Sequence, residues 1–166
     1  MAASDSAPTL PESILAGTRK ALPEDAIITT DVGWDKNSVG QEFDILTPGS
    51  ILTPGGFGQN PAMLATAVEK NLGIVWLVMN SNAFGTIAGL QKAHYGLTYG
   101  TTFLGEIGNP EFGPDYVDIA KAYGAVGVEV TSADELLPAL KSAIASGKPT
   151  VLDVAMTNNP TPTTGP

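Results

Sequence analysis

The stretch IVWLVMNSNAFG, residues 74–85, joins an unbroken apolar run to a group of small polar residues. The run 74–79 is typical of a strand buried on both faces of a parallel sheet. The polar residues 80–82 then lie where that strand ends. Residues 84–94 follow with helical spacing of their apolar positions, which predicts a helix packed back on the sheet.

The same alternation of strand and helix continues on both sides of this stretch. Helices are predicted over 11–22, 60–72, 84–94, 115–124 and 132–147, strands over 26–30, 74–79, 126–130 and 150–155, and loops over 40–58 and 96–113. Met63, Leu64, Ala67, Val68 and Leu72 form the predicted apolar stripe of the second helix. Strands separated by helices indicate βαβ units, and therefore an α/β fold of three layers, α/β/α, with a mostly parallel, Rossmann-like sheet.

Two details of the last helix are expected from its sequence. Ser132-Ala133-Asp134-Glu135 fits a capping box, in which the serine and the glutamate satisfy backbone amides of the first turn. Pro138 lies inside the predicted helix, where it removes a hydrogen bond. We therefore expect a kink at Pro138 or a later start of the helix.

The length of 166 residues suits one domain. We place this domain at 11–156, between a flexible N-terminal segment, 1–10, and a flexible tail rich in Pro and Thr, 157–166. The N-terminal residues contain no apolar h-region, which argues against a secretory signal peptide. The longest apolar run is too short to span a membrane, so we expect a cytoplasmic protein.

Composition excludes several kinds of function. The net charge is -9 and the eight basic residues are scattered, which disfavours a nucleic-acid partner. The absence of cysteine excludes disulfides, thiolate catalysis and cysteine-based metal sites. The single histidine, His94, excludes a histidine-rich metal site and is expected to be a surface or packing residue.

Three segments are expected at the carboxyl edge of the sheet, where open parallel sheets bind ligands: residues 31–35, 53–58 and 80–85. The second segment is rich in glycine and precedes a helix, which suits phosphate binding, although a simple tight loop is the commoner reason for such glycines. The third carries side-chain oxygens of the kind that Mg²⁺ or Ca²⁺ prefers. Its alternative interpretation is that Asn80 and Ser81 cap the next helix.

Taken together, these motifs resemble a known family. Asp31-Val32-Gly33, then Gly55-Gly56-Phe57, and then Asn80-Ser81-Asn82-Ala83-Phe84-Gly85-Thr86-Ile87 are similar to the C-terminal, thiamine-diphosphate-binding (PP) domain of acetolactate synthase and related carboligases and decarboxylases. The resemblance covers 11–155. It implies a transferase or lyase that acts on 2-oxo acids with thiamine diphosphate and Mg²⁺ as cofactors.

The resemblance also implies the positions of the site. The implied cofactor-binding residues are Thr53, Gly55, Gly56, Phe57, Asn82, Ala83, Phe84 and Gly85. The implied metal ligands are Ser81 and the Ala83 carbonyl. We assign no catalytic residue, because the family's activating glutamate comes from a separate pyrimidine-binding domain or subunit, which is the expected partner.

The chain departs from the family pattern at two places. It has no Gly-Asp-Gly motif, and its Gly-rich stretch leads directly into the next helix, as if a helix and a strand of about 25–35 residues had been removed. If Gly55-Gly56-Phe57 belongs to the second of the family's two Gly-rich segments, Pro54 occupies the position of the metal-binding aspartate; Ser81 stands where an Asn or Asp is usual. Loss of a central βα unit would expose apolar surface and favour oligomerisation.

Three functional interpretations follow. The first is a thiamine-diphosphate-binding domain that is catalytically incomplete alone. The second is a non-catalytic truncated or engineered fragment with a structural or self-associating role. The third, a nucleotide-binding domain of another kind, is disfavoured because the chain lacks both a Gly-x-Gly-x-x-Gly fingerprint and a Gly-Lys-Ser/Thr loop. Cofactor titration separates the first two.

Overall fold

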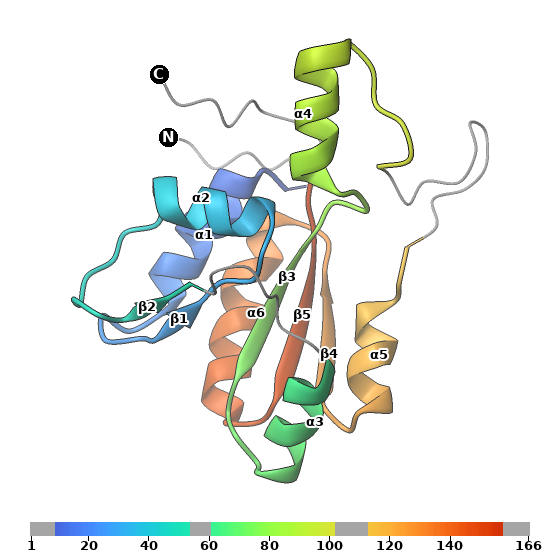
Figure 1. Cartoon of the computed structure of the whole chain (residues 1–166). Coiled ribbons are helices and arrows are strands. Elements are labelled where there is room, and N and C mark those ends of the chain that lie inside the picture. Colours follow the sequence, from blue (N-terminus) through green and yellow to red (C-terminus); the bar gives the residue numbers. More distant parts are fainter. Residues whose placement is uncertain (1–8, 54–60, 102–112, 158–166) are drawn as a thin grey trace.

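The computed structural model describes residues 9–53, 61–101 and 113–157. Its helices are α1 (Pro11–Ala21), α2 (Trp34–Glu42), α3 (Pro61–Glu69), α4 (Gly85–Tyr95), α5 (Tyr116–Ala122) and α6 (Ala133–Ser146). Its strands are β1 (Ile28–Thr29), β2 (Ile51–Leu52), β3 (Val75–Asn80), β4 (Val126–Val130) and β5 (Thr150–Ala155). Helices and parallel strands alternate along the chain (Figure 1), which confirms the predicted α/β architecture.

The main sheet has the strand order β3-β5-β4, and both pairs of strands are parallel. Val75 of β3 and Val126 of β4 both lie opposite Thr150, at the start of β5. β5 therefore has a strand on each side, and most of its residues are buried. The carboxyl ends of the three strands meet at one edge, as the sequence predicts for a site.

Successive side chains of β5 point to opposite faces of the sheet, and each face is covered by helices. Leu152 and Val154 are fully buried on the face covered by α1 and α6, against Ile14 and Leu136. Val151 lies on the other face, with residues of α3 and α5. Burial of one such aliphatic side chain contributes roughly 1.5–3 kcal/mol, and the cluster on the α1/α6 face has more buried residues than the cluster on the other face.

Helix α5 approaches β4 closely because Gly127 has no side chain. A Cβ atom on Gly127 would lie 2.6 Å from the backbone oxygen of Val117 and 2.9 Å from its Cα. The neighbouring atoms belong to backbone, which cannot move aside easily. Gly127 therefore sets the distance between α5 and the sheet.

A second parallel sheet pairs β1 with β2, with Ile28 opposite Ile51. Leu15, Val39 and Phe43 are buried beside this sheet, and Met79 of β3 packs against the same cluster. The loop predicted over 40–58 is thus wrong in part, because α2 extends to Glu42 and β2 lies within that range. The sequence of α2, WDKNSVGQE, has no apolar repeat, and β2 has only two residues, so neither gives a clear pattern.

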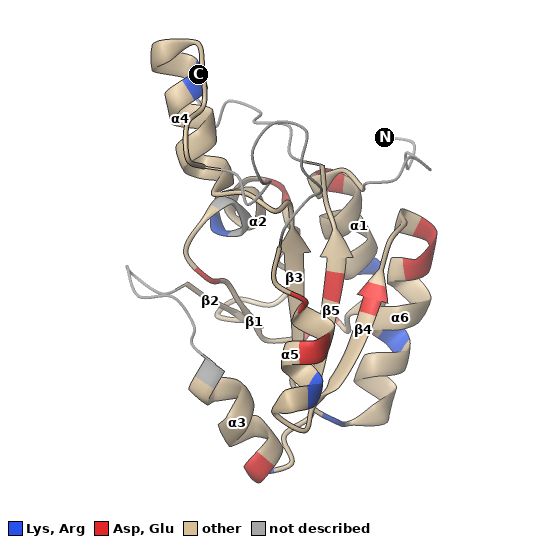
Figure 2. Ribbon diagram, turned by 90° about the vertical axis from the view of Figure 1, so that its right-hand side faces the viewer, with Lys and Arg blue, Asp and Glu red and all other residues tan. Residues whose placement is uncertain are grey.

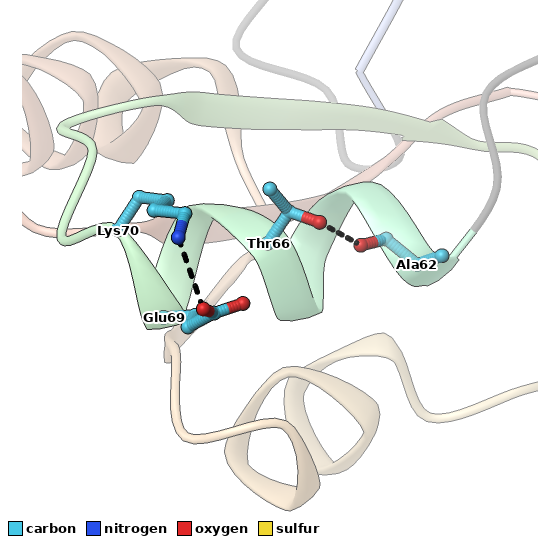
Figure 3. Close-up of polar contacts among 4 residues, drawn as sticks. All are labelled: Ala62, Thr66, Glu69 and Lys70. Atoms are coloured by element: carbon cyan, nitrogen blue, oxygen red, sulfur yellow. Dashed lines mark hydrogen bonds and ion pairs between the residues drawn. The ribbon is translucent and has the colours of Figure 1, made fainter.

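Helix α3 contacts the sheet through a narrower stripe than its sequence predicts. Leu64 and Ala67 are buried, and Val68 packs beside them, but Met63 and Leu72 are exposed. The outer side of α3 carries a hydrogen bond from Thr66 to the Ala62 carbonyl and an exposed Lys70–Glu69 ion pair of 3.0 Å (Figure 3). Exposed ion pairs contribute little stability, so α3 depends on its few apolar contacts.

Helix α6 runs as one helix through Pro138 and starts at Ala133, so the later start that Pro138 suggested is wrong. The capping box forms in part. Ser132 makes no side-chain cap, whereas Glu135 accepts hydrogen bonds from the backbone amide and the hydroxyl of Thr131, at 2.9 and 3.0 Å.

The chain segments next to β5 extend the edge of the sheet. Thr9 is buried and forms a parallel bridge with Met156, and its amide donates to the Ala155 carbonyl at 3.1 Å. The amide of Thr157 in turn donates to the Thr9 carbonyl at 3.0 Å. Among the described ranges, no helix is long and apolar enough to cross a bilayer.

Candidate cofactor-binding site

The turn formed by residues 80–85 connects the end of β3 to the start of α4 at the carboxyl edge of the sheet. α4 projects beyond this edge (Figure 1). Within the turn, Asn82 has a positive φ of 50°, in the left-handed region. Asn is one of the few residues with a Cβ that tolerates this conformation, because its short side chain bonds locally.

Asn80 holds the turn through its side chain. Its Nδ2 donates to Asp153 Oδ1 at 3.0 Å, and its Oδ1 accepts from the Asn82 amide at 3.1 Å. The cap residue of α4 is Phe84, and no side chain caps it. The alternative in which Asn80 or Ser81 caps this helix is therefore wrong, because the Asn80 side chain is engaged within the turn and with β5.

The two implied metal ligands lie next to each other. Ser81 Oγ is 3.5 Å from the Ala83 carbonyl oxygen. At this separation the Ser81 hydroxyl donates to the Ala83 carbonyl, and the two oxygens would be close enough to share one divalent cation. The turn thus presents two neutral oxygens that suit part of the coordination sphere of a divalent cation.

In the part of the chain that the structure describes, these two oxygens are not accompanied by a cluster of carboxylates. Within residues 9–53, 61–101 and 113–157, no group of three or more His, Asp or Glu residues is placed to hold a metal ion. A divalent cation prefers six or more oxygen ligands. The described residues therefore fit a cation only in part, and a diphosphate or water has to complete its coordination.

Only some of the other implied cofactor-binding residues lie within the described parts of the chain. Thr53 follows β2, and its hydroxyl lies 3.5 Å from that of Thr30, which follows β1. Both threonines thus lie at the carboxyl end of the small sheet. Gly55, Gly56 and Phe57 lie outside the described residues. Phe84 and Gly85 join the turn to α4, where the Phe84 side chain is exposed and its amide donates to the Thr101 carbonyl at 2.8 Å.

Two loops lie against the turn and its helix. Gly113 is so close to Asn82 that a Cβ on it would lie only 2.2 Å from the Asn82 Oδ1 atom. Farther along α4, the Gln91 side chain pairs with the backbone of Tyr99, at 2.8 Å to its amide and 3.2 Å to its carbonyl. Segments before and after residues 102–112 therefore both contact the site region.

The electrostatic surroundings of the turn are acidic. Asp153 lies opposite Glu129 in the sheet, and both lie on the strand segments drawn red on β5 and β4 in Figure 2. Burial raises the pKa of Asp153; the hydrogen bond from Asn80 lowers it, and Glu129 and Asp115 raise it. The net effect is a raised pKa of Asp153. Burial and then Asp153 also raise the pKa of Tyr116. A cation near the turn would reduce this repulsion.

Comparison with known proteins fixes the family. Residues 50–154 match the family model for the C-terminal TPP-binding domain of thiamine pyrophosphate enzymes. The chain belongs to this family. The match confirms the resemblance that the motifs of the sequence indicate, and it makes this chain a thiamine pyrophosphate-binding domain by family.

Curated relatives cover most of the chain. The putative thiamine pyrophosphate-containing protein YdaP of Bacillus subtilis is 29% identical over 184 residues, which include 92% of this chain and 31% of YdaP. A probable acetolactate synthase large subunit of Methanocaldococcus jannaschii is 26% identical over 189 residues, with 92% and 31% covered. Benzoylformate decarboxylase of Pseudomonas aeruginosa is 26% identical over 175 residues, with 92% and 33% covered. The chain spans about a third of the length of these relatives.

A solved structure supports the fold. The thiamine diphosphate-dependent 4-hydroxybenzoylformate decarboxylase of Rhodococcus jostii RHA1 matches 97% of this chain and 35% of its own, with a TM-score of 0.78 and 22% sequence identity. The arrangement of helices and strands is therefore that of a domain found in a thiamine diphosphate enzyme.

The contact between Asn80 and Asp153 is the part of the site that the sequence does not predict. Asn80 is an expected member of the polar turn, but its partner is 73 residues away. The available signal is the charge itself, because Asp153 interrupts the apolar strand Val151-Leu152-Asp153-Val154. A carboxylate in such a strand needs a hydrogen-bond donor nearby.

Proposed function

We propose that this chain is the diphosphate-binding domain of an enzyme that decarboxylates or ligates 2-oxo acids, and that its own cofactor site is incomplete. The observation that carries this proposal is the turn after β3, which brings Ser81 Oγ and the Ala83 carbonyl within 3.5 Å at the carboxyl edge of the sheet. Thiamine diphosphate, when bound, supplies the electron sink for such chemistry. The residues of this chain hold and orient its diphosphate, through a divalent cation.

Two findings support the incompleteness. The alignment with YdaP has 184 positions but includes 92% of 166 residues, or about 153, so about 31 positions of YdaP have no residue opposite them in this chain. This number is close to the length of a helix and a strand with their loops, about 25–35 residues. In addition, the described residues around the turn offer neutral ligands and no carboxylate cluster.

The proposed partner is a pyrimidine-binding domain or subunit of the same enzyme type, which also brings the activating glutamate. Helix α4 supports this proposal, because Ile87 and Leu90 on it are 52% and 55% exposed. Apolar side chains grouped on a projecting helix are typical of a surface that another protein covers. The activity is accordingly that of a transferase or lyase assembled from more than this chain.

Calorimetric titration of the purified chain with thiamine diphosphate tests the proposal. We expect weak, saturable binding with Mg²⁺ or Ca²⁺ present and none with EDTA, because the cation links the diphosphate to Ser81 and Ala83. Ser81→Ala should weaken the binding further. Circular dichroism of the same sample controls for folding. Absence of heat at millimolar cofactor from a folded sample contradicts cofactor binding.

A second candidate function is self-association without cofactor. It is favoured by the exposed apolar residues of α4 and by the two separate sheets, since within the described ranges β3 pairs with β5 alone. Light scattering after size-exclusion chromatography distinguishes the candidates. A stable oligomer that binds no thiamine diphosphate supports the second function, and a monomer that binds it supports the first.

A further inference from the structure

Asp153 is the only charged residue of the central strand β5. It is half-buried and lies on the face of the sheet that α5 covers, opposite Val78 of β3. A half-buried carboxylate is costly unless a donor satisfies it. The donor is the side chain of Asn80, which lies two residues after Val78 on β3 and therefore on the same face of the sheet.

The hydrogen bond to Asp153 selects the orientation of the Asn80 amide. A carboxylate only accepts hydrogen bonds, so the NH₂ end of Asn80 faces Asp153 at 3.0 Å. The oxygen end then faces the opposite way and accepts from the Asn82 amide at 3.1 Å. Asp153 on β5 thereby determines which group of Asn80 is available to the turn.

The bond to the Asn82 amide matters because of the backbone at that position. Asn82 has a φ of 50°, a conformation that is unfavourable for a residue with a Cβ. The left-handed residue lies between Ser81 and Ala83, whose oxygens are 3.5 Å apart. If Asn82 returned to an ordinary conformation, the backbone between these two oxygens would change direction.

We propose that Asp153 is a positioning residue for the 80–85 turn: it orients the Asn80 amide, which holds Asn82 in the left-handed conformation and keeps Ser81 Oγ beside the Ala83 carbonyl. The role in the turn follows from the contacts themselves. Its consequence for cation binding rests on the proposed function.

An effect of charge alone has to be separated from an effect of the hydrogen bond. Glu129 lies opposite Asp153, and Asp115 and Tyr116 of the α5 region are electrostatically coupled to it. Glu129→Gln removes one charge from the same cluster and leaves the hydrogen bond between Asn80 and Asp153 in place, and it is therefore the matched control. Asp153→Asn removes the charge of Asp153 and retains an oxygen that accepts from Asn80.

Amide hydrogen exchange in the full chain, measured by NMR on ¹⁵N-labelled protein, reports the turn directly. We expect Asp153→Ala to speed exchange at the Asn82 amide roughly five- to tenfold, the order expected for one lost hydrogen bond. Asp153→Asn and Glu129→Gln should leave it close to wild type. The internal reference is Asn71, which also has a φ of 50° and donates to the Val68 carbonyl at 3.2 Å.

The outcomes decide the role of Asp153. Unchanged exchange at Asn82 in Asp153→Ala overturns the proposal, and so does an equal increase in Glu129→Gln. Where Asp153→Ala does not fold, Asp153→Val fills the strand with a β-branched side chain and removes the acceptor in the same way. Faster exchange at Asn82 in that variant, with Asn71 unchanged, supports the proposal, and unchanged exchange at Asn82 overturns it.

Binding of Mn²⁺, followed by electron paramagnetic resonance, tests the consequence for the cation. Asp153→Ala should weaken Mn²⁺ binding on the order of tenfold, as loss of a residue behind the ligands does in metal sites, and Asp153→Asn should not. Equal binding by wild type and Asp153→Ala overturns this consequence. A wild-type chain that binds neither Mn²⁺ nor thiamine diphosphate instead contradicts the proposed function, while the exchange data still decide the role of Asp153 in the turn.

Discussion

At the scale of single residues, the proposed cation site depends on a neutral ligand, the Ser81 hydroxyl. A hydroxyl is a weaker ligand for Mg²⁺ than a carboxylate, which the ion prefers. We predict that Ser81→Asp tightens Mn²⁺ or Mg²⁺ binding on the order of tenfold by adding a charged oxygen beside the Ala83 carbonyl. Calorimetry measures the change. Ser142→Asp, on the exposed side of α6, adds the same charge elsewhere, and an equal gain in that variant would show that the effect is only general attraction.

Asp153 provides a prediction for the pH dependence of stability. Its pKa is raised in the folded state, chiefly by burial, so the unfolded chain loses this proton at lower pH than the folded chain does. The contribution of Asp153 to the free energy of unfolding is therefore complete below the ordinary pKa of aspartate and falls as the pH rises through the folded pKa. Asp153→Asn should remove this loss and be more stable than wild type near pH 7.

Urea unfolding of wild type and Asp153→Asn between pH 3 and pH 7 checks this sign. The difference in free energy of unfolding between the two proteins isolates the effect of Asp153 from groups that act in the opposite direction. Glu135 is one such group, because hydrogen bonds from Thr131 lower its pKa. The difference should grow with pH. A difference that stays constant over this range would mean that Asp153 does not titrate with a raised pKa in the folded chain.

At the scale of elements, the contact of α5 with β4 has no room for a methyl group at Gly127. We predict that Gly127→Ala lowers the free energy of unfolding by about 1–3 kcal/mol, the usual cost of overpacking, because the atoms around the new Cβ belong to the backbone of Val117. Thermal or urea denaturation measures the loss. A neutral effect would show that α5 can move away from the sheet at little cost.

The matched control is a glycine in a helix with open space around it. Gly40 lies in α2, is exposed, and has no atom within 4 Å of the position of a Cβ. Alanine loses less backbone entropy than glycine when a helix forms, so Gly40→Ala should raise the free energy of unfolding by roughly 0.5–1 kcal/mol. The same substitution is thus expected to lower the free energy of unfolding at Gly127 and to raise it at Gly40.

Sequence patterns predict the elements whose burial is regular and miss those whose burial is not. The strands β4 and β5 have the predicted bounds, and α1, α3, β3 and α4 differ from them by a few residues, because their apolar positions repeat. α2 and β2 are not predicted, because α2 has few buried side chains and no apolar repeat, and β2 has only two residues. Met63 and Leu72 are exposed although they fit the stripe, because the sequence does not show how far a neighbouring layer extends.

For the site, the sequence predicts the position of the turn but not what holds it. The order of polar residues after an apolar strand places Ser81 and Ala83 at the carboxyl edge, where the structure brings their oxygens together. The hydrogen bond between Asn80 and Asp153 depends on the pairing of β3 with β5, which only the folded chain determines. The charge of Asp153 within an apolar strand is a local signal that a donor is needed, but it does not identify Asn80 as that donor.

At the scale of the whole molecule, the strands divide into two parallel sheets, and the side chains of β3 are intermediate in exposure along its whole length. β5 lies between two strands and is largely buried. This contrast is what we expect if a helix and a strand between β2 and α3 are missing, since the missing strand would lie beside β3 in a continuous sheet. The arrangement of the molecule and the lack of a carboxylate cluster among the described residues would then share one cause.

Insertion of a helix and a strand at this place tests whether the two features share a cause. We predict that inserting a helix and a strand of about 31 residues, taken from the matching domain of YdaP, between Thr53 and Pro61 produces tight thiamine diphosphate binding that depends on Mg²⁺ and reduces self-association. A Gly/Ser insertion of equal length is the control for chain length, because loop closure costs rise only slowly with length. Calorimetry and light scattering measure both effects. If the YdaP segment gives a monomer but no binding, a missing unit explains the incomplete burial of β3, and the poor cofactor binding is then due to the turn itself, at Ser81.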